Sequence, residues 1–226
     1  VATTASIVSG ALAERILIWP FFLFTAILTA FIYPIAGSWQ WGGGWLSEMG
    51  FSDFAGSTLV HSVGGYAALA GAILLGARDG KYSADGKVNV IGGCSLPMTT
   101  LGVFILWLGW FGFNGGSQLA LGSGADATAV ADIFVNTNLA AAGGVLACMI
   151  VSKATNSHTN IAATLNGAIA GLVAITAEPL TPSMGQAVII GAIGGIICMY
   201  GMKLLDMLKI DDVVGAIPAH LFAGIW

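Results

Sequence analysis

Residues 53–61 read DFAGSTLVH and residues 212–220 read DVVGAIPAH. An aspartate, a glycine and a histidine recur in the two stretches with the same spacing, D-x-x-G-x-x-x-x-H. The copies end at His61 and His220, the two histidines of the chain that lie in apolar segments. The third histidine, His158, lies in the polar run SKATNSHTN and is expected in a solvated loop. We therefore interpret the two stretches as one duplicated unit.

The first copy opens an apolar segment, residues 54–76, in which His61 is the only ionisable side chain besides Tyr66. The eight residues from Asp53 to His61 would rise about 12 Å along a helix. Because the hydrocarbon core of a bilayer is about 30 Å thick, we expect His61 near the midplane. An isolated histidine at that depth is more often packed against a neighbouring carbonyl group, and the second copy shifts the balance towards function.

The composition excludes an ordinary soluble domain, because 57% of the residues are hydrophobic, only 8% are charged, and 33 of the 226 are glycine. Cys94, Cys148 and Cys198 are odd in number and widely spaced, which argues against a disulfide framework or a metal cluster. The first residues do not have the pattern of a cleavable signal peptide. Both ends of the sequence cut through apolar segments, so we expect a fragment of a longer protein.

The apolar pattern predicts an all-α polytopic membrane protein with about six complete spans and two partial ones. The complete spans are expected at residues 17–36, 54–76, 96–119, 127–152, 160–176 and 184–205. The partial spans are residues 1–13 and the end of the chain from residue 213. The stretch 160–176 is the weakest of the six, because it is short and contains Thr164 and Asn166.

The basic residues predict an orientation. If the spans alternate in direction, the loops on one side hold all seven lysines and arginines: Arg15, Arg78, Lys81, Lys87, Lys153, Lys203 and Lys209. The positive-inside rule assigns that side to the cytoplasm. The loops of the opposite side contain acidic residues and no basic residue. We therefore expect a multi-pass protein of the cell membrane whose basic loops are cytoplasmic.

This orientation makes the two copies of the unit run in opposite directions across the membrane. Within a single transmembrane domain, residues 1–226, residues 1–76 would be the end of one half and residues 96–226 most of an inverted second half. Inverted repeats of this kind place a substrate path near the midplane, where the halves meet. Glycines at helical spacing would let the helices approach closely. These pairs are Gly112 with Gly116, Gly167 with Gly171, and Gly191 with Gly195.

Two histidines near the midplane are compatible with three kinds of site. A membrane haem protein usually supplies four histidines for two haems, and a catalytic metal site needs three or more ligands. A conducting pore needs only a few polar groups in a narrow apolar passage, and neutral imidazoles can hold a hydrogen-bonding substrate there. Of the three kinds of site, the pore needs the fewest residues that the sequence lacks, so no metal or cofactor is expected.

The residues expected at the outer ends of the spans indicate what could enter such a pore. Trp41 lies in a WGGG loop, and residues 109–117 read GWFGFNGGS. An aromatic face with a nearby hydroxyl suits a small cation, which it attracts by about 1–2 kcal/mol when partly desolvated. Alternatively, Trp110, Phe111 and Phe113 face lipid or pack in the core, and Ser117 caps a helix end.

Several stretches together resemble the ammonium transporter family, the Amt/Mep/Rh proteins, and the Amt branch in particular. They are SIVSGALAERI at 6–16, WGGG at 41–44, DFAGSTLVH at 53–61, GWFGFNGGS at 109–117, FVNTNLAAA at 134–142, NGAIAGLVAIT at 166–176 and DDVVGAIPAH at 211–220. The resemblance implies a homotrimer with one pore per subunit. It also implies eleven helices in two inverted five-helix halves, of which this chain would run from within the third helix to within the tenth.

The resemblance implies roles for the residues of the pore. It makes His61 and His220 the paired histidines that line the passage, and Trp110 a further lining residue. Phe113 corresponds to one of two stacked phenylalanines that gate the pore, and the second would lie immediately before Val1.

The resemblance also implies an ammonium recruitment site at the outer mouth, formed in part by Trp41 and Ser117. Asp53 would support this site without contacting the ion. Leu221 follows His220 where many family members have glycine, which leaves the helix packing at that point open.

The expected mechanism is that ammonium is recruited at the mouth, loses its water and its proton at the gate, and passes the histidines as ammonia. Burying a bare cation in an apolar passage would cost far more than the recruitment contacts return. The alternatives are an ammonium sensor that conducts poorly and a non-functional membrane scaffold. The expected partners are the lipid bilayer, the other subunits of the trimer and, in the full-length form, a cytoplasmic regulatory protein; a nucleic-acid partner and an enzymatic activity are not expected.

Overall fold

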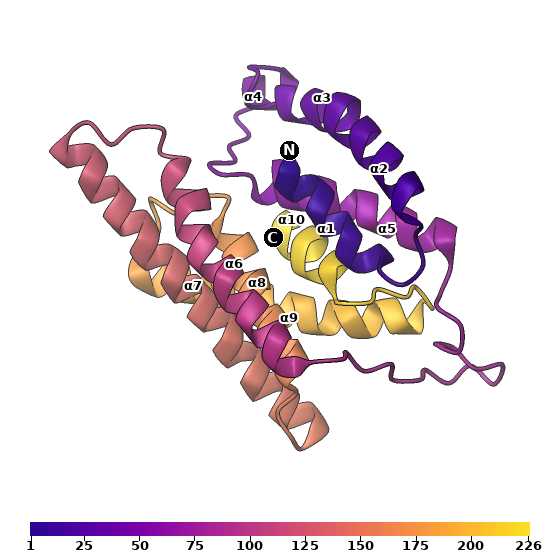
Figure 1. Ribbon diagram of the computed structural model, residues 1–226. Coiled ribbons are helices and arrows are strands. Elements are labelled where there is room, and N and C mark those ends of the chain that lie inside the picture. The colour runs from indigo at the N-terminus through magenta and orange to yellow at the C-terminus, as the bar shows by residue number, and fades with distance from the viewer.

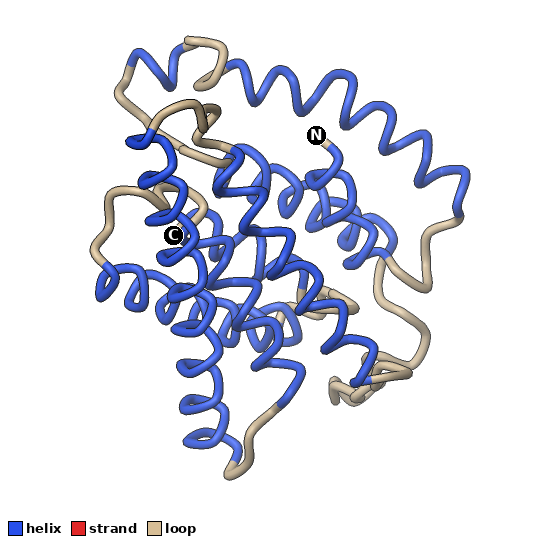
Figure 2. Tube along the Cα trace, turned by 60° about the vertical axis from the view of Figure 1, so that its left-hand side comes forward, coloured by secondary structure: helices blue, strands red, loops and turns tan.

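The computed structural model describes residues 1–226, apart from the side chain of Asn156. The regular secondary structure of the described chain is helical, with loops between the helices and one isolated β-bridge between Tyr82 and Val88 (Figure 2). The α-helices are α1 (Ala2–Leu12), α2 (Ile18–Ile27), α3 (Tyr33–Ser38), α4 (Trp45–Glu48), α5 (Val63–Leu75), α6 (Leu96–Gly116), α7 (Gly124–Asn156), α8 (Ile161–Ile175), α9 (Met184–Met207) and α10 (Ala223–Ile225). Three π-helical segments adjoin them, η1 (Leu28–Ile32), η2 (Ser57–Ser62) and η3 (Pro218–Phe222).

The helices form two groups that meet at the C-terminal turn. Helices α6, α7, α8 and α9 lie together, and α1 packs against α5 in the other group (Figure 1). The continuous helix formed by α2, η1 and α3 lies at the outer edge of the second group. The turn formed by η3 and α10 lies between the groups and contacts both of them.

Five helices are long and apolar enough to cross a membrane, which confirms the predicted class of polytopic helical protein. They are Ile18–Ser38, Ser57–Leu75, Leu96–Gly116, Gly124–Thr155 and Met184–Met207.

The sixth span, predicted at residues 160–176, is the apolar 15-residue helix α8, which is shorter than the other five. Its length of about 22 Å is less than the roughly 30 Å of a hydrocarbon core. Helix α8 is apolar because α6, α7, α9 and η3 surround it within the protein.

Four of the helices begin at a polar side chain that accepts a hydrogen bond from a backbone N–H group of the first turn. In α7 and α9 this contact is reciprocal: Ser123 pairs with Asp126, and Ser183 pairs with Gln186. Such capping satisfies donors that would otherwise be unpaired at the helix start, and it explains why these helices begin where they do. The two remaining caps are Ser95 of α6 and Asn160 of α8.

The predicted glycine contacts are present in two of the three pairs. A Cβ atom on Gly171 would lie 2.3 Å from the carbonyl oxygen of Ala140 in α7, and one on Gly191 would lie 1.9 Å from it. Gly167 and Gly195, the partners in these pairs, are confined by neighbours in the same way. In contrast, Gly112 and Gly116 of α6 would meet no other atom within 4 Å, because they lie on the outer face of that helix.

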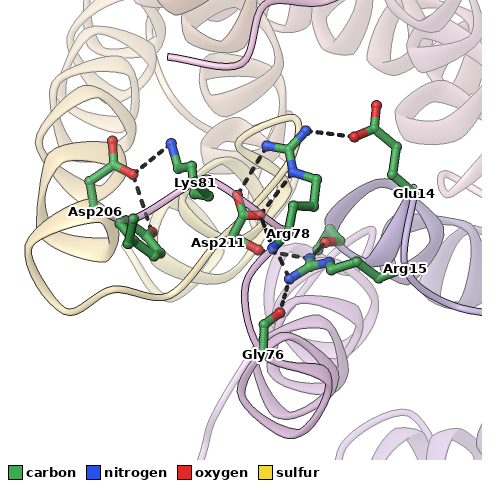
Figure 3. A network of polar contacts seen from close by, with 9 residues as sticks. Glu14, Arg15, Gly76, Arg78, Lys81, Asp206 and Asp211 are labelled. Carbon is green, nitrogen blue, oxygen red and sulfur yellow. Dashed lines mark hydrogen bonds and ion pairs between the residues drawn. The ribbon is translucent and has the colours of Figure 1, made fainter. Parts of the chain in front are cut away.

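A buried ionic cluster joins the ends of α1 and α5 to the segment before η3 (Figure 3). The carboxylate of Asp211 accepts hydrogen bonds from the backbone N–H, Nε and Nη2 of Arg78, at 2.9, 2.8 and 3.0 Å. The guanidinium group of Arg15 donates to the carbonyl oxygens of Asp211, Gly76 and Ala11. The cluster therefore fixes the position of the second D-x-x-G-x-x-x-x-H unit relative to the group of helices that contains α1 and α5.

Candidate functional site

The first copy of the repeated unit forms a capped π-helical turn. The carboxylate of Asp53 accepts hydrogen bonds of 2.8–2.9 Å from four consecutive backbone N–H groups, those of Gly56, Ser57, Thr58 and Leu59. Gly56 has a φ of 111°, a left-handed conformation that favours glycine, and this lets the chain turn into η2. Burial raises the pKa of Asp53, although the backbone hydrogen bonds oppose that shift. The aspartate and the glycine of the unit thus set the direction of the turn that carries His61.

The second copy repeats this arrangement. The carboxylate of Asp212 accepts hydrogen bonds from the backbone N–H groups of Ala216 at 3.1 Å and Ile217 at 2.7 Å. Gly215 has a φ of 77°, and η3, which carries His220, follows at Pro218. Burial raises the pKa of Asp212 to about 6. The shared spacing in the sequence therefore corresponds to a shared local structure.

The two histidines meet. Their Nδ1 atoms are 3.1 Å apart, and the rings stack with centroids separated by 5.1 Å and planes inclined by 19°. A hydrogen bond between two Nδ1 atoms requires one donor and one acceptor, so at least one of the rings is neutral. His61 is fully buried, and its Nε2 has no hydrogen-bond partner among the described residues. The pair can therefore offer a hydrogen-bonding nitrogen to a small neutral molecule.

The segments that carry the histidines pass each other in opposite directions. Near the start of η2, the hydroxyl oxygen of Ser57 lies 3.3 Å from the carbonyl oxygen of Gly224, and near its end that of Ser62 lies 3.4 Å from the carbonyl oxygen of Leu221. Leu221 is buried, and its Cβ would lie 2.6 Å from a Cβ atom on Gly65. A glycine on the opposite helix thus accommodates the leucine.

Two of the predicted aromatic residues lie against His61. The ring of Trp110 stacks on that of His61, with centroids 4.9 Å apart and planes inclined by 13°. The ring of Phe113 is 5.4 Å from His61 and inclined by 39°. Trp110 is only 5% exposed, so it does not face lipid. Phe111, in contrast, points elsewhere and pairs with Phe134 at 5.4 Å.

Each of the two residues predicted at the outer mouth donates a hydrogen bond to a backbone carbonyl oxygen nearby in the sequence. Trp41 is 44% exposed, and its Nε1 donates to the carbonyl oxygen of Asp53 at 2.9 Å. The hydroxyl of Ser117 donates to the carbonyl oxygen of Phe113 at 2.8 Å, as expected for the alternative in which it caps the end of α6. Among the described side chains, Trp41 and Ser117 share no hydrogen bond with each other.

Three buried polar residues near Trp110 were not singled out from the sequence. The indole Nε1 of Trp110 donates to the hydroxyl of Thr176 at 2.8 Å, and the Nδ2 of Asn114 donates to the hydroxyl of Thr137 at 3.0 Å. Their position inside apolar segments could have indicated them, because a polar side chain there is costly unless it has a specific partner. Among the residues that the structure describes, no group of three histidine, cysteine or acidic side chains could hold a metal ion.

A model of the Ammonium Transporter Family matches residues 1–226. The chain belongs to the ammonium transporter family. Members of this family are membrane transport proteins and not enzymes.

Ammonium transporter Amt2 of Archaeoglobus fulgidus is 47% identical to this chain. The match covers all of this chain and 49% of Amt2. Among solved structures, a sensor Amt protein matches with a TM-score of 0.95 and 43% identity, over 99% of this chain and 56% of its own. Candida albicans Mep2 matches with a TM-score of 0.87 and 37% identity, over 98% of this chain and 48% of its own. The chain spans about half the length of the curated relatives it matches.

Proposed function

We propose that the full-length protein transports ammonium across a membrane through a passage lined by His61 and His220. The observation that carries this proposal is the stacked series of rings formed by Trp110, His61 and His220 in an apolar bundle, with Trp110 and His61 buried and His220 partly buried. The series offers hydrogen-bonding nitrogens and no acidic side chain. It therefore suits a small neutral base better than a cation, which would need a charged or strongly polar partner.

The proposed sequence of events starts at the exposed ring of Trp41, which attracts ammonium together with Ser117. Asp53 acts indirectly, because its carbonyl oxygen orients the indole of Trp41 and its carboxylate holds the start of η2. Near Phe113, ammonium transfers its proton to water at the outer mouth, and ammonia then passes the two imidazoles. Potassium has no proton to lose and is excluded.

The wider arrangement is part of the same proposal. The basic ends of the helices face the cytoplasm of a cell membrane, and the two units belong to inverted halves, residues 1–76 and 96–226. The full-length protein forms a homotrimer and binds a cytoplasmic regulatory protein. The many exposed apolar side chains of α2, α6 and α9 fit contact with lipid and with neighbouring subunits.

A second candidate is an ammonium sensor that binds the ion at the same site and conducts little. The observation that favours it is the likeness to the solved sensor Amt protein, with a TM-score of 0.95. Uptake measurements on the purified full-length protein in liposomes distinguish the two functions. For a transporter we expect ammonium uptake above that of empty liposomes and no uptake of potassium. Ammonium binding without uptake would support the sensor, and equal uptake of both ions would contradict the proposed passage.

A further inference from the structure

We infer that Thr176 is a positioning residue that sets the plane of the Trp110 ring against His61 and thereby the selectivity of the passage. This inference rests on the proposed function. The indole has one polar atom, Nε1, and it donates to the hydroxyl of Thr176 at 2.8 Å. Thr176 is fully buried and Trp110 nearly so, which means that water does not compete for this hydrogen bond.

The hydroxyl of Thr176 is itself fixed. It can donate to the carbonyl oxygen of Leu172 at 2.7 Å, one turn earlier in α8, with the Oδ1 of Asn114 at 3.2 Å as the alternative acceptor. Asn114 lies on α6, as Trp110 does, and its Nδ2 is held by Thr137 of α7 at 3.0 Å. The network thus has partners on three helices, and the orientation of the indole follows from their packing.

Thr176 also contacts the segment that leads to His61. Its carbonyl oxygen accepts a hydrogen bond from the backbone N–H of Ala55 at 3.0 Å, and the next carbonyl, that of Ala177, accepts one from Phe54 at 2.8 Å. One residue therefore holds both the ring that stacks on His61 and the backbone just before the turn that carries it. Loss of the hydroxyl would free the indole while leaving the backbone contact in place.

The test uses the full-length protein in liposomes and measures the ratio of methylammonium to ammonium uptake. Thr176→Val keeps the shape of the side chain and removes the hydroxyl, so we expect this ratio to change about fivefold, the effect of one ordinary hydrogen bond. Thr176→Ser keeps the hydroxyl and should restore the wild-type ratio. Thr164→Val, on a partly exposed face of the same helix, is the matched control and should not change it. A purely structural role would reduce the amount of folded protein without changing the ratio.

An unchanged ratio in Thr176→Val would overturn the inference. Thr176→Val could fail to fold because it leaves the indole N–H unpaired. In that case the test uses Trp110→Phe, which removes this donor. The uptake ratio of the double variant Trp110→Phe, Thr176→Val should then equal that of Trp110→Phe alone. A different ratio in the double variant would also overturn it. Structures of Thr176→Val and Thr176→Ser provide a readout that does not depend on transport. A ring displaced from His61 only in the valine variant supports the inference even if the wild-type protein conducts nothing, in which case the proposed function alone fails.

Discussion

Replacement of Asp211 by asparagine will lower the stability of the full-length protein by about 3–5 kcal/mol, the usual effect of removing one partner from a buried ion pair. The carboxylate of Asp211 is fully buried, and the side chain of Arg78 that it binds is only 9% exposed. Arg15 lies at 3.9 Å and is 8% exposed. Asparagine would leave the two guanidinium groups with only the exposed carboxylate of Glu14, 2.9 Å from Nη1 of Arg78, as a counter-charge.

Thermal unfolding of the detergent-solubilised protein measures this effect. The matched control is Asp206→Asn, because Asp206 pairs with Lys81 at 3.0 Å but its side chain is 41% exposed. An exposed pair of this kind contributes about 1 kcal/mol or less. If the two variants unfolded at the same temperature, the buried cluster would not have the role that we assign to it.

The same pair predicts a dependence of stability on pH. Burial raises the pKa of Asp211, but the hydrogen bonds and the charge of Arg78 outweigh this effect and hold the pKa below its ordinary value. A carboxyl group with a lowered folded-state pKa contributes stability that is complete above the unfolded-state value of about 4. That contribution is lost as the pH falls through the folded-state pKa. We therefore expect the loss of stability on lowering the pH to be larger for the wild-type protein than for the Asp211→Asn variant.

Replacement of Asp53 by asparagine will have the second large effect, because four backbone N–H groups depend on the carboxylate. Asparagine has one acceptor oxygen, and its amide N–H₂ would face at least two of these buried donors. Each unpaired donor costs about 1–3 kcal/mol, so we expect a loss of about 2–6 kcal/mol together with a displaced His61 and reduced ammonium uptake.

The other copy of the unit provides the control for Asp53→Asn. The carboxylate of Asp212 accepts well-formed hydrogen bonds from two backbone N–H groups, those of Ala216 and Ile217, against four at Asp53. Asp212→Asn should therefore lower the melting temperature by less than Asp53→Asn. The reverse order in an unfolding experiment would contradict this interpretation of the two turns.

The repeated unit could be predicted because its residues act locally. An aspartate that caps a turn and a glycine with positive φ must lie at fixed offsets from the histidine that follows, so Asp53, Gly56 and His61 leave a pattern in the sequence. The apolar runs likewise predict the long helices. Their period does not reveal whether a run is buried by lipid or by protein, so the enclosure of α8 by α6, α7, α9 and η3 could not be predicted.

Contacts between distant segments could not be read from the sequence. The pairing of Arg78 with Asp211 joins residues 133 positions apart, and that of Trp110 with Thr176 joins residues 66 positions apart. The same limit applies to the glycines of α6, since the spacing of Gly112 and Gly116 does not tell whether that face meets another helix. Only the packing of the helices decides these contacts.

The most direct measurement compares the wild-type full-length protein with the double variant His61→Ala, His220→Ala in liposomes. Both proteins are offered ammonium and potassium at equal concentration, and the uptake of each ion is followed. We expect the wild-type protein to take up ammonium and not potassium, and the double variant to lose this selective uptake. Ammonium uptake that remained selective and undiminished without the two imidazoles would contradict the proposed passage.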